Sequence, residues 1–176
     1  MIRSFTTNPR AIRTYMGKDV DVFDTDPDSI LIEDIAHALA SICRFGGHTP
    51  YHYSVAEHSI CCMLSVSCDN MLAALLHDAS EAYLCDIPRP IKAEMPEYKK
   101  IEDKLMGVIA GKFGFQYPLH PEVKAVDEQM LSVEWDTMMI GRKPGILNLA
   151  AMAAEMSFLD KYRHLKRLEK MNTAAQ

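Results

Sequence analysis

Hydrophobic residues recur at helical spacing through most of the chain, beginning near residue 30. After a predicted N-cap at Asp28 or Ser29, apolar side chains lie three and four residues apart, which is the spacing of one helix face. These positions are Ile32, Ile35, Ala36, Leu39 and Ile42. Because Gly46 and Gly47 disfavour helix, we expect the first helix to end before them.

The same spacing predicts further helices along the rest of the chain. Their approximate ranges are 54–67, 70–84, 97–113, 121–140 and 146–169. Asp69 is the expected N-cap of the helix over 70–84, and Pro121 falls in the first turn of the helix over 121–140. The segment CDIPRPIKAEMP contains three prolines, which lack a backbone donor and disfavour helix, so a loop is expected there.

The first 30 residues have a different pattern, rich in polar and turn-forming residues. Short alternation around Val20, Val22 and Phe23 predicts a small hairpin or an ordered arm. The chain has the length of one domain and no internal repeat. We therefore expect an all-α fold, with a short irregular or hairpin arm over residues 1–29 and a single helical bundle over residues 30–176.

Composition narrows the classes of function. The net charge of −5 and the isoelectric point near 5.8 repel polyanions, so no nucleic acid polymer is expected as a partner. No apolar run reaches the ~20 residues that span a bilayer, so no membrane partner is expected. Five cysteines without CxxC spacing, together with the polar start of the chain, favour a cytoplasmic location. Most of these cysteines are expected to be small buried side chains.

Four strongly polar side chains lie within apolar helical segments, namely His58, His77, Asp78 and Asp127. Asp127, for example, interrupts a hydrophobic stripe where a solvated carboxylate is not expected. Burying such groups is costly unless something compensates for their charge, and a metal ion does so. The sequence therefore predicts that these four residues together hold one divalent cation.

Two imidazoles and two carboxylates form a mixed nitrogen and oxygen ligand set, which suits Co, Mn, Zn, Ni, Fe or Mg. If a coordination position stays open, bound water becomes a nucleophile near neutral pH, which predicts hydrolysis. Glu81 is four residues after His77 and three after Asp78, so it can orient or deprotonate that water. Arg44, Arg89 and Lys92 are candidates for contacts with phosphoryl oxygens.

These segments resemble the HD-domain metal-dependent phosphohydrolases, in the branch of bacterial 5′-deoxynucleotidases and phage deoxynucleoside triphosphate hydrolases. The resemblance covers about residues 30–140 and is carried, in this order, by AEHS, LLHDASEAYLCDIPRPIK and VDEQ. It implies the metal ligands named above and a catalytic carboxylate at Glu81. It also implies that Asp86 contacts the sugar and that Arg44 and Lys92 hold phosphate.

The chain departs from the family pattern in two places, namely one pair of residues and the segment GGHTPYHY that precedes His58. The 5′-deoxynucleotidases have an Arg-Trp pair whose indole crowds the position of a ribose 2′-hydroxyl, whereas this chain has Arg44-Phe45. Phe45 is thus a candidate substrate contact, and deoxyribose selectivity stays open. His48 and His52 follow near the expected mouth of the site, and their roles are open as well.

The leading hypothesis is a metal-dependent 5′-nucleotidase that releases phosphate from nucleoside monophosphates. Two alternatives remain at this point: release of triphosphate from a deoxynucleoside triphosphate such as dATP, and a non-catalytic nucleotide-binding module. A purely structural helical protein would bind no metal. A small nucleotide is the expected partner, and apolar helical surface makes a homodimer or larger homo-oligomer plausible.

Overall fold

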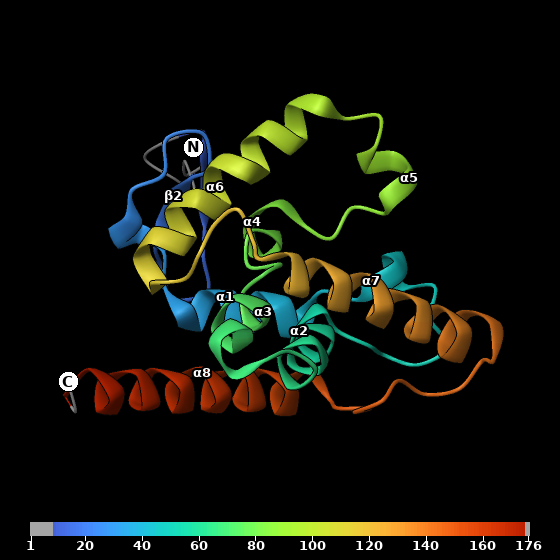
Figure 1. Ribbon diagram of the computed structural model, residues 1–176. Helices are drawn as coiled ribbons and strands as arrows, with labels where there is room; N and C mark the ends of the chain where they lie inside the picture. Colours follow the sequence, from blue (N-terminus) through green and yellow to red (C-terminus); the bar gives the residue numbers. More distant parts are fainter. Residues whose placement is uncertain (1–8, 175–176) are drawn as a thin grey trace.

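A computed structural model describes residues 9–174, which are mainly helical with one small hairpin (Figure 1). The hairpin strands are β1 (Ala11–Arg13) and β2 (Asp19–Asp21), which pair antiparallel with Ile12 opposite Val20. The prediction of an all-α fold with a short hairpin arm is therefore confirmed. Residues 1–8 of the predicted arm and residues 175–176 of the predicted bundle lie outside the described residues.

The helical elements include short 3-10 turns and one π-helix, η4, besides the α-helices. In chain order they are η1 (Pro27–Ser29), α1 (Ile32–Ser41), η2 (Arg44–Gly47), α2 (Val55–Leu64), η3 (Cys68–Asn70), α3 (Met71–Leu75), α4 (Glu81–Leu84), α5 (Arg89–Lys92), α6 (Pro96–Phe113), α7 (Pro121–Glu134), η4 (Trp135–Ile140) and α8 (Ala151–Ala174). In Figure 1, α8 runs along one side of the molecule and α6 along the opposite side, with α1, α2 and α3 between them.

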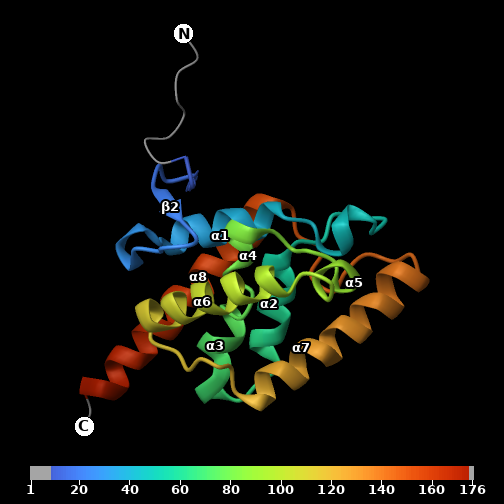
Figure 2. The ribbon, with the colours of Figure 1, turned by 90° about the horizontal axis from the view of Figure 1, so that it is seen from above.

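Helix α2 lies at the centre of the packing. Its start is defined by a capping box, in which the Ser54 side chain accepts from the Glu57 backbone N–H and the Glu57 carboxylate accepts from the Ser54 backbone N–H. From Val55 to Met63 all its side chains are buried, and it contacts α1, α3, α7 and α8. Figure 2 shows α7 crossing beside it. The helix predicted over 54–67 is thus confirmed, with its C-terminal end at Leu64.

The first predicted helix is shorter than expected at both ends. The expected N-cap at Asp28 or Ser29 is wrong, because those residues belong to η1, which Asp26 caps instead. Helix α1 begins after Leu31 and ends at Ser41. The next two residues are extended, and Cys43 forms an isolated antiparallel bridge with Ser54.

The single helix predicted over 70–84 is wrong, because it is broken into α3 and α4 by turns at residues 76–80. The carbonyl of Ala74 accepts a hydrogen bond from the His77 ring Nδ1, at 2.8 Å. In a continuous helix that carbonyl would accept from the backbone N–H of Asp78. Asp69 is not the N-cap either, since Asn70 occupies that position without a side-chain bond.

The other predicted elements need smaller corrections. Helix α6 matches the prediction, α7 continues into η4 as expected to residue 140, and α8 starts at Ala151, later than predicted. The proline-rich segment contains the short helix α5. Cys61 and Cys62 are buried, Cys43 is partly buried, and Cys68 and Cys85 are exposed, so the prediction that most cysteines are buried is wrong. Among residues 9–174, no helix combines the length and hydrophobicity of a transmembrane segment.

We predict that α8 is held to the bundle mainly by Phe158, which is fully buried. Phe158→Ala should lower the free energy of unfolding by about 3–5 kcal/mol, because it removes a large buried side chain and leaves a cavity. Met156→Ala on the same helix is the control, since Met156 is 62% exposed. Urea denaturation measures the free energy of unfolding of both variants. Equal losses of that free energy would show that burial on α8 does not determine stability.

Candidate metal centre and its pocket

The two histidines of the predicted cluster meet in the protein interior. His58 comes from α2 and is fully buried, and His77 comes from the turn between α3 and α4. Their Nε2 atoms lie 3.2 Å apart. Two basic nitrogens so close together, away from water, need a proton or a cation between them.

Both predicted carboxylates lie beside this pair of nitrogens. Asp127 Oδ1, from α7, is 3.1 Å from His58 Nε2 and 3.7 Å from His77 Nε2. Asp78 Oδ2 is 3.2 Å from His77 Nε2 and 3.8 Å from His58 Nε2. Ligand atoms about 2.1 Å from a metal and 90–109° apart lie roughly 3.0–3.4 Å from one another. The observed separations are close to that range, so the residues fit a metal ion.

Each imidazole is oriented by a hydrogen bond at its other nitrogen. His58 Nδ1 lies 2.6 Å from Glu134 Oε1, and His77 Nδ1 lies 2.8 Å from the carbonyl of Ala74. A carboxylate and a carbonyl can only accept, so both Nδ1 atoms donate. Both Nε2 atoms therefore face the cluster, as metal-binding histidines require.

Glu134 is a residue of the cluster that the sequence did not predict. It is 1% exposed, and besides His58 it accepts from Tyr53 Oη at 2.8 Å and from Arg44 Nε at 3.0 Å. Although burial favours the neutral form, the bond from His58 and the charge of Arg44 lower the pKa of Glu134. The signal that could have found it is spacing, since Glu134 lies two helical turns after Asp127 on one face.

The thiol of Cys62 is a further potential donor at the cluster. Ligand atoms of His58, Cys62, His77 and Asp127 all lie within 4.8 Å of one another, so this buried group could hold a metal ion. Cys62 Sγ lies 3.5 Å from His58 Nε2 but also 4.0 Å from His58 Nδ1. The sulfur thus lies against the side of the ring. Asp78, which approaches both Nε2 atoms, is the better fourth ligand.

The ionisable groups of the cluster shift one another's pKa values. Although burial favours the neutral carboxyl groups, His77 and His58 lower the pKa values of Asp78 and Asp127. Burial and Arg44 lower the pKa of His58, but hydrogen bonds with Asp127, Cys62 and Glu134 outweigh them and raise it to about 10. The raised pKa of His58 favours a proton held within the cluster, and a metal ion must displace that proton to bind there.

Glu81, the predicted catalytic carboxylate, lies at the start of α4 and lines the pocket beside Asp78 and Asp127. It is 6% exposed, and its buried Oε2 has no hydrogen-bond partner among the described residues. Burial, reinforced by the charges of Asp78 and Asp86, raises the pKa of Glu81 well above its usual value. This carboxyl group can therefore hold a proton near neutral pH and deliver it into the pocket.

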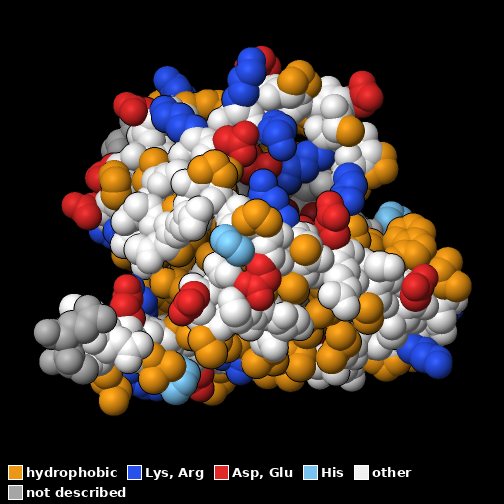
Figure 3. Space-filling view, in the orientation of Figure 1, with side chains coloured by type: hydrophobic (Ala, Val, Ile, Leu, Met, Phe, Trp, Pro, Cys, Tyr) orange, Lys and Arg blue, Asp and Glu red, His pale blue; other side chains and the backbone are white. Residues whose placement is uncertain are grey.

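The pocket next to the cluster has a volume of about 750 Å³. All of the predicted substrate contacts line it, namely Arg44, Phe45, Asp86, Arg89 and Lys92. Figure 3 shows lysine and arginine side chains gathered around this hollow in the surface. Lys92 Nζ is 2.5 Å from Glu102 Oε1 of α6, so an anion that binds Lys92 must compete with that carboxylate.

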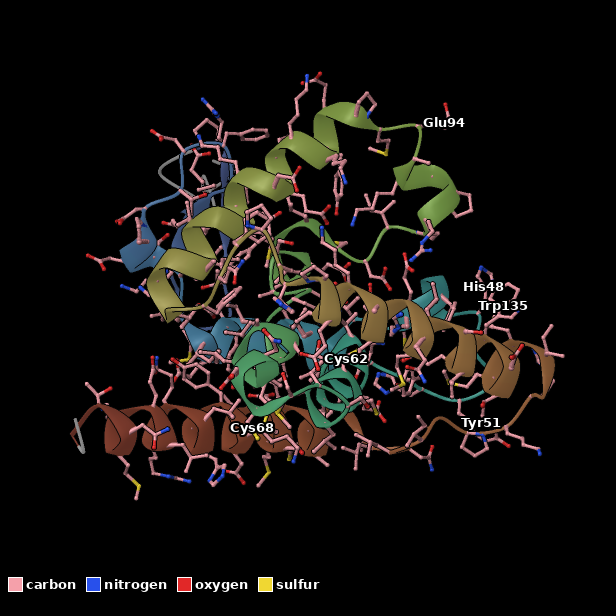
Figure 4. The ribbon with its side chains drawn as sticks, in the orientation of Figure 1. His48, Tyr51, Cys62, Cys68, Glu94 and Trp135 are labelled. Carbon is pink, nitrogen blue, oxygen red and sulfur yellow. The ribbon has the colours of Figure 1, made fainter. Side chains whose placement is uncertain are left out.

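The two loop histidines are placed differently. His48 lines the pocket, where Figure 4 shows it at the same end of α7 as Trp135. His52 is exposed and is not among the lining residues. Within the described residues, neither belongs to the group of donors that could hold a metal ion.

The fold and the cluster define an all-α protein with a buried histidine and aspartate site that could hold a metal ion. No family model matches the chain. It is 42% identical over 123 residues to the uncharacterized protein YfdR of Escherichia coli, which covers 70% of this chain and 69% of YfdR. It is also 38% identical over 129 residues to the uncharacterized protein RCAP_rcc00048 of Rhodobacter capsulatus, covering 65% and 66%. The chain belongs to the YfdR family.

We expect a divalent metal to stabilise the protein, because the cluster places carboxylates and imidazoles together only in the folded state. At a free metal concentration 100 times the dissociation constant, the stabilisation should be about 2.7 kcal/mol. Thermal unfolding with Mn²⁺, Co²⁺ or Zn²⁺, compared with a chelator, measures it. An unchanged midpoint with every metal would contradict a metal site.

Glu134→Gln should weaken metal binding by roughly 10- to 100-fold, because it removes the charge that orients and polarises His58. Asp136→Asn makes the same change in charge two residues further along, at an exposed side chain, and is the control. Isothermal titration calorimetry measures the metal affinity of both variants. If Glu134→Gln binds metal as tightly as Asp136→Asn does, the hydrogen bond to His58 does not set the affinity.

Proposed function

We propose that the protein is a metal-dependent phosphohydrolase of the HD-domain superfamily that acts on small nucleotides. The observation that carries this proposal is the convergence of two imidazole nitrogens and two carboxylates at a pocket lined by Glu81 and several basic side chains. This combination supports hydrolysis of an anionic ester better than it supports a structural metal site, which would be closed by its ligands.

The proposed cofactor is one divalent ion, Co, Mn, Zn, Ni, Fe or Mg, held by His58, His77, Asp78 and Asp127. When bound, the metal supplies Lewis acidity and lowers the pKa of water, which provides a nucleophile near neutral pH. Arg44 Nη1 is 3.8 Å from Asp78 Oδ2, so the guanidinium can hold phosphoryl oxygens next to the cluster.

Glu81 moves the proton in the proposed reaction. Water attacks phosphorus, the bond between phosphorus and the ester oxygen breaks, and the leaving oxygen needs a proton. Glu81 takes a proton from the attacking water and returns one to the leaving oxygen. Burial raises the pKa of Glu81, which makes its carboxylate a stronger base toward water than an exposed glutamate.

Phosphate release from a nucleoside monophosphate is the preferred reaction. Arg44 and Lys92 would hold the phosphate, while Asp86 and Phe45 contact the sugar. Release of triphosphate from a deoxynucleoside triphosphate such as dATP is the second candidate, because Arg89 adds a third cation to the pocket lining. A cytoplasmic location and a homodimer or larger homo-oligomer complete the proposal, and the five free cysteines are consistent with a reducing compartment.

A turnover screen of the metal-loaded protein against ribo- and deoxynucleoside mono-, di- and triphosphates tests the function. We expect release of phosphate, or of triphosphate, that falls at least about 100-fold in Glu81→Ala, since a positioned acid or base contributes about 10²–10⁴-fold. No turnover with metal bound and nucleotide bound would identify a non-catalytic nucleotide-binding module instead.

The division of roles has its own controls. Asp78→Ala should lose metal and turnover together, whereas Glu81→Ala should keep the metal. Cys62→Ala is the matched control for Asp78→Ala, because both residues lie next to His58. Elemental analysis measures the metal content of each purified variant. Loss of metal in Cys62→Ala with retention in Asp78→Ala would replace Asp78 by Cys62 in the ligand set.

A further inference from the structure

The pocket has two chemically different ends. The metal cluster, Glu81 and the basic side chains form one end. The remaining lining is apolar and consists of Phe45, Ile87, Pro88, Leu131, Trp135 and Met139. Its volume of about 750 Å³ is within the range of small-ligand sites, roughly 300–1,000 Å³. A ligand that fills it therefore needs an anionic part and an apolar part.

Trp135 is the largest side chain of the apolar end, and it is 48% exposed. It shares the pocket lining with Phe45, Leu131 and Met139, so its exposed indole belongs to an apolar wall of the pocket and is available to a ligand. Trp135 begins the π-helix η4, directly after the buried Glu134. Such π-helical turns occur often at functional sites. Here the turn places a metal-orienting carboxylate and a pocket aromatic at adjacent positions.

Phe45 forms a side wall next to Trp135. The two ring centroids are 6.0 Å apart with an interplanar angle of 56°. A planar ligand cannot lie between rings that are tilted and this close, so it must stack on the open face of Trp135. Phe45 has a φ of 56°, which is uncommon for a residue with a side chain, and such backbone conformations cluster at active sites and ligand-binding sites.

The spacing between the two ends also fits one kind of ligand. Trp135 is eight residues after Asp127 on the same helical segment, which is about 12 Å along the axis at 1.5 Å per residue. An anion at the cluster and a ring on Trp135 must therefore be separated by a further group. A nucleotide has this order, with phosphate, then sugar, then a flat base.

On the basis of the proposed function, we infer that Trp135, with Phe45 beside it, is the platform on which the nucleobase of the substrate stacks. Stacking does not read the hydrogen-bonding edge of a base, so the platform accepts each base, with purines bound more tightly because they cover more of the indole. Trp135 is thus a determinant of specificity for nucleotides over simple sugar phosphates.

Trp135 is the only tryptophan of the chain, so its fluorescence reports directly on this site. We would titrate metal-loaded, full-length Glu81→Ala protein with dAMP, 2-deoxyribose 5-phosphate and inorganic phosphate. We expect dAMP to quench the indole emission, and the two ligands without a base to leave it unchanged. Equal effects of dAMP and 2-deoxyribose 5-phosphate, or no effect of dAMP, would overturn the platform.

This readout separates the two proposals. Quenching by dAMP without turnover in the wild-type protein would support the platform and contradict the proposed hydrolase activity. Turnover of dAMP without quenching would support the proposed hydrolase and contradict the platform.

Variants of Trp135 give a second test. Trp135→Ala should weaken dAMP binding by roughly 5- to 150-fold, the range that loss of one stacked base produces, while Trp135→Phe retains most of the affinity. Binding of 2-deoxyribose 5-phosphate should not change in either variant. Ile140→Ala is the control, because Ile140 is exposed on the same π-helix outside the pocket. Equal losses for both ligands in Trp135→Ala, measured by calorimetry, would indicate a structural role and contradict the inference.

Discussion

The buried hydrogen bond between His58 and Glu134 is the interaction on which the rest of the site depends. An imidazole and a carboxylate taken out of water are costly, and each is tolerated here because the other, together with Arg44 and Tyr53, satisfies its polar atoms. Through this contact α7 is fixed against α2, and the same contact turns the Nε2 atom of His58 toward Asp127. The same hydrogen bond therefore stabilises the packing of α7 on α2 and orients a predicted metal ligand.

Much of this arrangement could be predicted from local sequence. The helical periodicity predicted α2, α6 and α7, and Ser54 begins α2 through a capping box that also holds Glu57. The ligand prediction relied on the cost of burying His58, His77, Asp78 and Asp127 in apolar segments, and the structure brings these residues together. The assigned roles of metal ligand, acid and substrate contact stay predictions until metal and turnover are measured.

What could not be predicted involves contacts between distant parts of the chain. The helix over 70–84 is broken at residues 76–80, where the ring of His77 donates to the carbonyl of Ala74, and hydrophobic periodicity carries no sign of this side-chain contact. Glu134 looks like an ordinary surface glutamate until Tyr53, Arg44 and His58 surround it. The role we infer for Trp135 likewise depends on Phe45, which lies 90 residues away in sequence and contributes the other wall of the pocket.

The wide separation of these partners along the chain has a consequence for folding. His58 and Glu134 are 76 residues apart, and Arg44 and Glu134 are 90 residues apart, so the site closes only after long loops have been ordered. Contacts of this range form late and slow the folding of a domain. Local unfolding that separates α7 from α2 would expose every ligand at once. The site is thus a reporter of tertiary structure, since separating α7 from α2 removes its ligands without unfolding either helix.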